Sequence, residues 1–144
     1  MNNLADSFNQ TLVSFINFLI ALNTVNTSKI KLYKGVTQSM ISREPSWLIE
    51  QFIIHILPFY EKIKKKDIDY FMNKTYDSAE EKVNGFFKEK YKEDNKNSNM
   101  LDALEMKKIF PLLTKNKQDL ICEYLIFLAD SGKDYLDLMM IQQN

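Results

Sequence analysis

Residues 47–63 read WLIEQFIIHILPFYEKI, and this stretch decides the fold class. Its apolar residues recur one, three and four positions apart, which is the spacing of one face of an α-helix. They are Leu48, Ile49, Phe52, Ile53 and Ile56. Pro58 removes a backbone donor and its ring clashes with the preceding turn, so we expect the helix to break or kink there. Upstream, Pro45 suits the first position of this helix, because the N–H that proline lacks would have no partner there.

The segment before this stretch shows the same period. Near the N-terminus, apolar residues spaced four, three, four and three apart predict a long buried helix. They are Phe8, Leu12, Phe15, Leu19 and Leu22. The polar residues 23–28 predict a turn, after which Thr27 or Ser28 can cap a short helix. That helix carries Leu32, Val36 and Met40.

The segment after it also predicts helices. Leu101, Leu104 and Ile109 indicate a short helix that ends or bends near Pro111. Thr114 or Asn116 can cap a last long helix. Its apolar face would carry Leu120, Ile121, Tyr124, Leu125 and Leu128. Ser131-Gly132 would interrupt this helix before the chain ends.

No segment of the chain alternates apolar and polar residues for more than a few positions. We therefore predict an all-α protein, a single compact bundle of five to seven helices with breaks near Pro58 and Pro111. Residues 1–144 would form one domain. Residues 92–99 contain no apolar side chain, so we expect a mobile polar loop there.

The composition excludes several classes of chemistry. The chain has 19 Lys+Arg and 19 Asp+Glu, and zero net charge removes the simplest electrostatic case for nucleic acid or an anionic membrane as partner. A single histidine, His55, and a single cysteine, Cys122, exclude a disulfide framework and a His/Cys zinc cage within one chain. The three glycines are well separated, which excludes a glycine-rich phosphate loop. We expect no cofactor and no enzymatic activity.

Three features could still carry chemistry. His55 could act as a base or metal ligand, and Cys122 could pair with it as a nucleophile. Asp67 and Asp69 could hold Mg²⁺ beside a phosphate. We favour the structural interpretation of each: a partly buried histidine, a small buried hydrophobe, and a helix cap followed by a solvated carboxylate.

The most apolar stretch, residues 12–22, is too short to cross a membrane. As a helix it covers about 16 Å, against a hydrocarbon core of roughly 30 Å. No Lys or Arg precedes it, so the basic region of a signal peptide is missing. We expect no membrane span and no targeting segment, and the lone thiol fits a reducing compartment.

Residues 43–73 carry a resemblance to a known family. They combine Glu44-Pro45 before a helix, the Leu57-Pro58-Phe59 break, and a Lys66-Asp67 turn followed by Tyr70-Phe71. This arrangement resembles a family of small uncharacterised all-helical proteins encoded by nucleocytoplasmic large DNA viruses (giant viruses). The helix expected over residues 113–128 also resembles the end of that family. The resemblance implies a viral origin, an α-helical fold and a place in the host cytoplasm or the virion, and it implies no activity.

The function that we expect is a non-enzymatic interaction or structural role. Tyr (7), Phe (10) and Met (7) are plentiful, and those left over after the core is filled favour protein interfaces. The partner would be a viral or host protein, or a second copy of the chain, held by an apolar helical surface. A groove that captures a host amphipathic helix is a special case. The residues we expect at such a surface are Phe18, Met139, Met140 and Ile141.

The alternative is a nucleic-acid-binding accessory factor. Lys62, Lys64, Lys65 and Lys66, with Tyr70 nearby, form the one local basic and aromatic cluster. Such residues can engage phosphates and stack on bases. Glu61, Asp67 and Asp69 nearly cancel the charge, and no arginine is present there, so nucleic acid is the less favoured partner.

Overall fold

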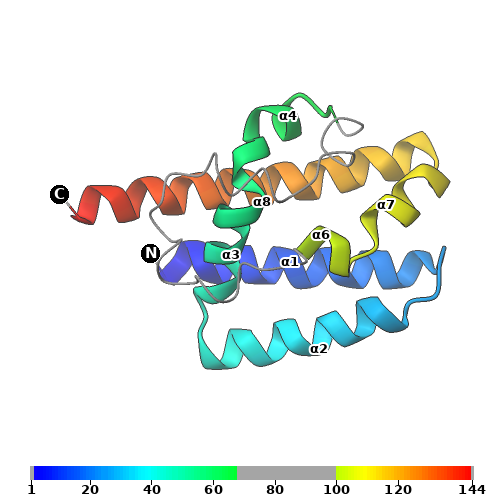
Figure 1. Ribbon diagram of the computed structural model, residues 1–144, viewed down its shortest axis with the longest axis horizontal. Coiled ribbons are helices and arrows are strands. Elements are labelled where there is room, and N and C mark those ends of the chain that lie inside the picture. Colours follow the sequence, from blue (N-terminus) through cyan, green and yellow to red (C-terminus); the bar gives the residue numbers. More distant parts are fainter. Residues whose placement is uncertain (1, 68–99, 144) are drawn as a thin grey trace.

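The computed structural model describes residues 2–67 and 100–143, and every regular element in them is helical (Figure 1). The α-helices are α1 (Asn2–Leu22), α2 (Ser28–Arg43), α3 (Trp47–His55), α4 (Tyr60–Lys64), α6 (Met100–Ala103), α7 (Met106–Ile109) and α8 (Lys115–Gln143). Two 3₁₀ turns, η1 (Leu57–Phe59) and η3 (Phe110–Leu112), complete the list. The all-α prediction is confirmed, whereas the predicted loop at 92–99 lies outside the described residues.

The two longest helices, α1 and α8, lie side by side and run in opposite directions (Figure 1). α2 lies along α1, and α3 crosses both long helices to reach α4 on the far side of α8 (Figure 1). One cluster of buried apolar side chains joins these elements and includes residues of α6 and α7. The crossing of α3 over α8 therefore sits near the middle of the core.

The stripe predicted for α1 is the face that it buries. Phe8, Leu12, Phe15 and Leu19 have at most 1% of their surface exposed, and Leu22 at the end of the helix is half-buried. Asn23 ends α1 in the left-handed conformation, with φ of 50°, which asparagine tolerates better than most residues. The predicted turn at 23–28 follows.

α2 forms where it was expected but turns a different face inward. Leu32 and Val36, two of the apolar residues that mark this helix in the sequence, are 71% and 47% exposed. Ile30 and Thr37 are buried instead. Because Thr37 is polar, apolar periodicity in the sequence does not identify the buried side of α2.

α3 is buried on almost every side, since seven of its nine residues are buried. It begins at Trp47, two residues after Pro45, so the prediction that proline takes the first helical position is wrong by about half a turn. The backbone N–H of Trp47 donates to the Glu44 carbonyl at 3.0 Å and makes the turn that precedes the helix. The breaks at Pro58 and Pro111 are confirmed, because each proline lies in a 3₁₀ turn.

α8 is continuous, so the prediction that Ser131-Gly132 interrupts the helix is wrong. Gly132 lies where α8 packs against α3. A Cβ added to it would lie in ordinary contact, 3.4 Å from Phe52 Cδ1 and 3.6 Å from Ile53 Cγ1. The predicted cap at Thr114 is confirmed, since α8 begins at Lys115 and Thr114 Oγ1 accepts from the Lys117 N–H at 3.4 Å.

None of the helices in the described part of the chain combines the length and the apolar character that crossing a bilayer requires.

Candidate functional site

The two candidate catalytic residues, His55 and Cys122, are buried, as structural residues usually are. His55 ends α3 with 9% of its surface exposed, and Cys122 in α8 has 4% exposed. Desolvation raises the pKa of the Cys122 thiol, partly opposed by Lys66, so the reactive thiolate is disfavoured. The surface pocket that Cys122 lines does not include His55. The structure therefore does not assemble the proposed dyad at an open site.

A metal site is also unsupported among the residues that the structure describes. They contain no group of three or more His, Cys, Asp or Glu side chains that could hold an ion. Asp67 is exposed and forms an ion pair with Lys62 at 3.6 Å. Asp69, the other half of the predicted pair, lies outside the described residues.

The basic cluster lies on α4 and the turn after it, and part of its charge is neutralised. Lys64 Nζ donates to both carboxylate oxygens of Asp130 in α8 at 3.1 Å, and it lies 5.8 Å from the Tyr60 ring centroid. The Tyr60 hydroxyl also donates to Asp130, at 2.7 Å, and this bond raises the pKa of Tyr60 to about 12. Lys62 is paired as above, whereas Lys65 and Lys66 are exposed. Tyr70 lies outside the described residues.

The four predicted interaction residues divide between the surface and the edge of the core. Met140 is 41% exposed and Ile141 is 68% exposed. Met139 is partly buried against the core. Phe18 is half-buried at the seam between α1 and α8, where its ring centroid lies 5.7 Å from that of Tyr124.

Ile141 belongs to a longer apolar series along the solvent side of α8, which we call the outer face. Its members are Leu120, Phe127, Leu138 and Ile141, with exposed fractions of 46%, 46%, 38% and 68%. With 3.6 residues per turn, these positions fall within about 60° of one another around the helix. The outer face therefore consists of two pairs of exposed apolar side chains on one side of α8, and Phe127 and Leu138 lie eleven positions, about three helical turns, apart.

A shallow groove of about 330 Å³ opens in the N-terminal half of the outer face. Leu120, Glu123, Tyr124 and Phe127 of α8 line it, together with Thr11 of α1. Tyr124 also stacks on the buried Phe15 ring, with centroids 5.1 Å apart and planes 27° apart. The groove therefore contains an aromatic side chain that the core holds in place.

The polar residues beside the outer face are mainly acidic. Glu123 and Asp134 fall within the same sector of the helix, and no ion pair joins either of them to a described residue. Asp137, slightly to one side, pairs with Lys133 at 3.2 Å. The outer face thus combines apolar contact area with two negative charges that form no ion pair with the described part of the chain.

Sequence reasoning found one end of the outer face and missed the rest. Leu120 and Ile121 were both expected on the buried side of their helix, which is right for Ile121 and wrong for Leu120. Phe127 and Leu138 were not singled out. Their spacing could have revealed them, because Leu120 and Leu138 are about five helical turns apart, on the side opposite Leu125.

No family model, curated protein or solved structure matches this chain. The resemblance to proteins of giant viruses stays a prediction. The functional inference therefore depends on the residues of the chain itself.

Proposed function

We propose that this chain is a non-enzymatic interaction protein that binds a protein partner through the outer face of α8. The observation that carries the proposal is the set of four exposed apolar side chains on one side of α8, with an aromatic groove at one end. Exposed apolar surface often marks binding sites, and aromatic anchors in pockets contribute a large share of binding free energy.

The partner that best fits this surface is an amphipathic helix with basic residues. Its apolar side would lie along Leu120, Phe127 and Leu138, and its basic residues would meet Glu123 and Asp134. A helix laid in an apolar groove is a common mode of recognition, and complementary charge steers it into place. A second copy of the chain, docked through the same face, would bring these carboxylates together and is therefore disfavoured.

The same charges argue against nucleic acid on this face, because phosphates and carboxylates repel each other. In the setting that the viral resemblance suggests, the partner is a viral or host protein in the host cytoplasm or the virion. The proposal about the outer face does not depend on that setting.

The test compares two double variants of the tagged chain, expressed in cells that carry its native genome. Phe127→Ser with Leu138→Ser removes apolar contacts from the outer face. Leu32→Ser with Val36→Ser is the matched control, since it removes two apolar side chains from α2 that are even more exposed. We expect the first variant to lose a stoichiometric partner that the control retains, with both variants as folded as the parent by circular dichroism.

Two further arms identify the kind of partner. Treating half of each sample with nuclease should leave the complex intact, and Glu123→Lys with Asp134→Lys should weaken binding and abolish its salt dependence. A complex that disappears with nuclease, or that both double variants retain equally, would refute the proposal. A dimer in light scattering that Phe127→Ser dissociates would instead assign the outer face to a second copy.

A further inference from the structure

α2 carries the largest net positive charge of the helices within residues 2–67 and 100–143. Its sixteen residues contain no Asp or Glu, and its basic residues are Lys29, Lys31, Lys34 and Arg43. α8, which lies on the other side of α1, has three lysines against five acidic residues (Figure 1). The zero net charge of the whole chain therefore conceals a basic edge at α2 and an acidic one at α8.

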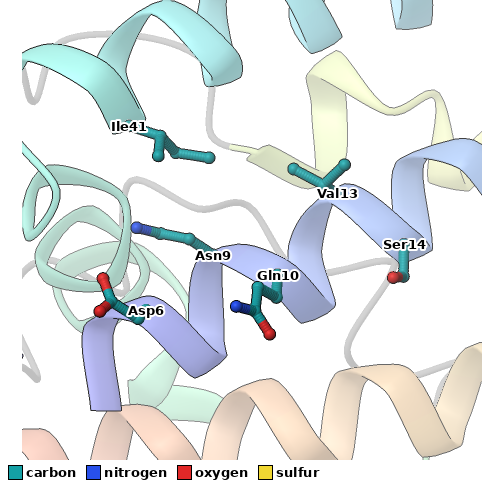
Figure 2. A pocket seen from close by; sticks show the side chains of 6 residues that line it. All are labelled: Asp6, Asn9, Gln10, Val13, Ser14 and Ile41. Carbon is teal, nitrogen blue, oxygen red and sulfur yellow. The ribbon is translucent and has the colours of Figure 1, made fainter. Parts of the chain in front are cut away.

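The buried residues of α2 show which of its sides points outward. Ile30 and Thr37 are buried, and Ile41 lies on the same inward side, where Figure 2 shows it across a cleft from Val13 of α1. With 3.6 residues per turn, Leu32 falls about 140–160° around the helix from Ile30 and Thr37. Leu32 therefore points away from the core, which agrees with its exposed fraction of 71%.

The outward side of α2 combines apolar and basic side chains, and we call it the α2 face. Leu32, Val36 and Arg43 fall within about 40° of one another around the helix, and lysines lie on the two flanks. All members of the α2 face are exposed: Lys29, Lys31, Leu32, Val36 and Arg43. Long basic side chains beside apolar ones are typical of helices that lie at a membrane surface.

The positive charge of the α2 face is only partly compensated by the described part of the chain. No ion pair joins Lys31 or Arg43 to a described residue. Lys29 lies 3.9 Å from Glu105, which is partly buried. Glu44, the residue after the helix, is half-buried as well. The face is therefore complementary to a partner with negative charge.

The shape of the α2 face favours a bilayer over a nucleic acid. Gly35 lies beside Leu32, and a Cβ added to it would meet no atom within 4 Å, so a flat surface can approach this side of the helix. Apolar side chains among the cations gain nothing from phosphates, whereas they gain from the acyl region of a bilayer. Tyr33, the one aromatic residue of α2, packs against the core and does not offer a ring on which a base could stack.

We propose that the α2 face binds the surface of an anionic lipid bilayer. The basic side chains would meet the negative headgroups, and Leu32 and Val36 would enter the boundary between the headgroups and the acyl chains. α2 would then lie in the plane of the membrane surface. The outer face of α8 contributes no residue to this contact, so the inference is independent of the proposed function.

The experiment is co-sedimentation of the full chain with two sets of large unilamellar vesicles. One set is phosphatidylcholine, and the other replaces about one third of it with phosphatidylserine. We expect binding to the anionic set alone, and weaker binding at higher salt, because salt screens the surface potential. Binding to neither set, or equal binding to both, would overturn the proposal.

Matched charge variants separate the α2 face from a general effect of charge. Lys31→Gln with Arg43→Gln should weaken binding to the anionic vesicles on the order of 25-fold, because each basic residue near such a surface contributes about fivefold. Lys65→Gln with Lys66→Gln removes the same charge from exposed positions in the turn after α4 and should leave binding unchanged. Equal weakening by the two variants would mean that the α2 face is not the site.

The serine variants used for the outer face test the apolar part of the contact. Leu32→Ser with Val36→Ser should also weaken binding to the anionic vesicles, whereas Phe127→Ser with Leu138→Ser should not. This is the reverse of the pattern expected for a protein bound to α8, so the two proposals fail separately. Full retention of vesicle binding by the α2 variant would overturn the inference, because it would leave only a cluster of cations.

Two other occupants of the α2 face are also outcomes of the test. A short DNA duplex that binds more tightly than the vesicles, and equally well to Leu32→Ser with Val36→Ser, would assign the cations to nucleic acid. A dimer in light scattering without vesicles, dissociated by the same variant, would assign the face to a second copy of the chain. Either result would overturn the proposal.

Discussion

Two consecutive helices, α2 and α3, are joined by three residues and bury very different shares of their surface. α3 buries seven of nine residues, whereas α2 buries only Ile30 and Thr37 of its sixteen. α3 lies across both long helices, and α2 lies along the outside of α1 (Figure 1). The difference indicates that stability is concentrated at the α3 crossing rather than along α2.

The largest expected effect tests this contrast with one substitution made in both helices. Leu48 in α3 is 4% exposed and Leu32 in α2 is 71% exposed. Leu48→Ala should lower the free energy of unfolding by about 2–5 kcal/mol, because it removes buried methyl groups and leaves a cavity. Leu32→Ala should change it by less than about 0.5 kcal/mol. Urea unfolding followed by circular dichroism measures both, and equal losses would show that α2 is as much a part of the core as α3.

A smaller effect is expected at the polar contact that joins α3 to α8. The Tyr135 hydroxyl donates to Glu50 Oε2 at 2.7 Å, and both residues are buried. Tyr135→Phe keeps the ring and removes this donor, so we expect a loss of about 1–3 kcal/mol in the free energy of unfolding. Tyr124→Phe is the control, since Tyr124 lies in the same helix and packs against the Phe15 ring but is only half-buried. A neutral result for Tyr135→Phe would mean that Glu50 is satisfied without it.

Tyr135 and Tyr33 should make the free energy of unfolding depend on pH in alkaline solution. Desolvation and the bond to Glu50 raise the pKa of Tyr135 above its ordinary value of 10.0, and desolvation raises the pKa of Tyr33 in α2 to about 12. Above pH 10 the unfolded chain has lost these protons and the folded protein still holds them. The free energy of unfolding should therefore fall as pH rises from 10 to 12, and it should be independent of both groups below pH 9.

Phenylalanine variants separate the contributions of the two helices to this slope. Each group that titrates only in the unfolded state contributes roughly 1.4 kcal/mol per pH unit. Tyr135→Phe and Tyr33→Phe should each flatten the fall in urea midpoint between pH 10 and 11. If neither variant changes the slope, the folded protein does not hold these protons and the burial of the two rings is less complete than it looks.

The contrast between α2 and α3 also shows which features of the fold could be predicted from the sequence. The α1 stripe and the break at Pro58 were predictable, because apolar periodicity and the chemistry of proline act locally. The inward face of α2 was not, since Thr37 is buried there while Leu32 is exposed, and only the position of α1 decides between the two faces. Gly132 was taken as a break for the same reason, because its role depends on Phe52 in another helix.

The candidate sites were less predictable than the fold. Ile141 could be proposed from its place in an apolar run near the end of the chain, but Phe127 looked like one more core residue of a long helix. Only the packing of α8 against α1 and α3 shows which apolar residues of α8 remain exposed to solvent. The hydrogen bond from Asn9 to the Pro45 carbonyl joins residues 36 positions apart, which no local pattern indicates.

The smallest expected effect concerns the two glycines that lie inside helices. A Cβ added at Gly35 in α2 meets no atom within 4 Å, so Gly35→Ala should raise the free energy of unfolding by about 0.8–1 kcal/mol, the difference in helix propensity. At Gly132 in α8 the same Cβ would touch the Phe52 ring at 3.4 Å, close to the limit of ordinary contact. Gly132→Ala should therefore gain less than Gly35→Ala, although the propensity term is the same. Thermal unfolding of the two variants side by side measures the difference. A larger gain at Gly132 would show that α8 has room for a Cβ beside the Phe52 ring.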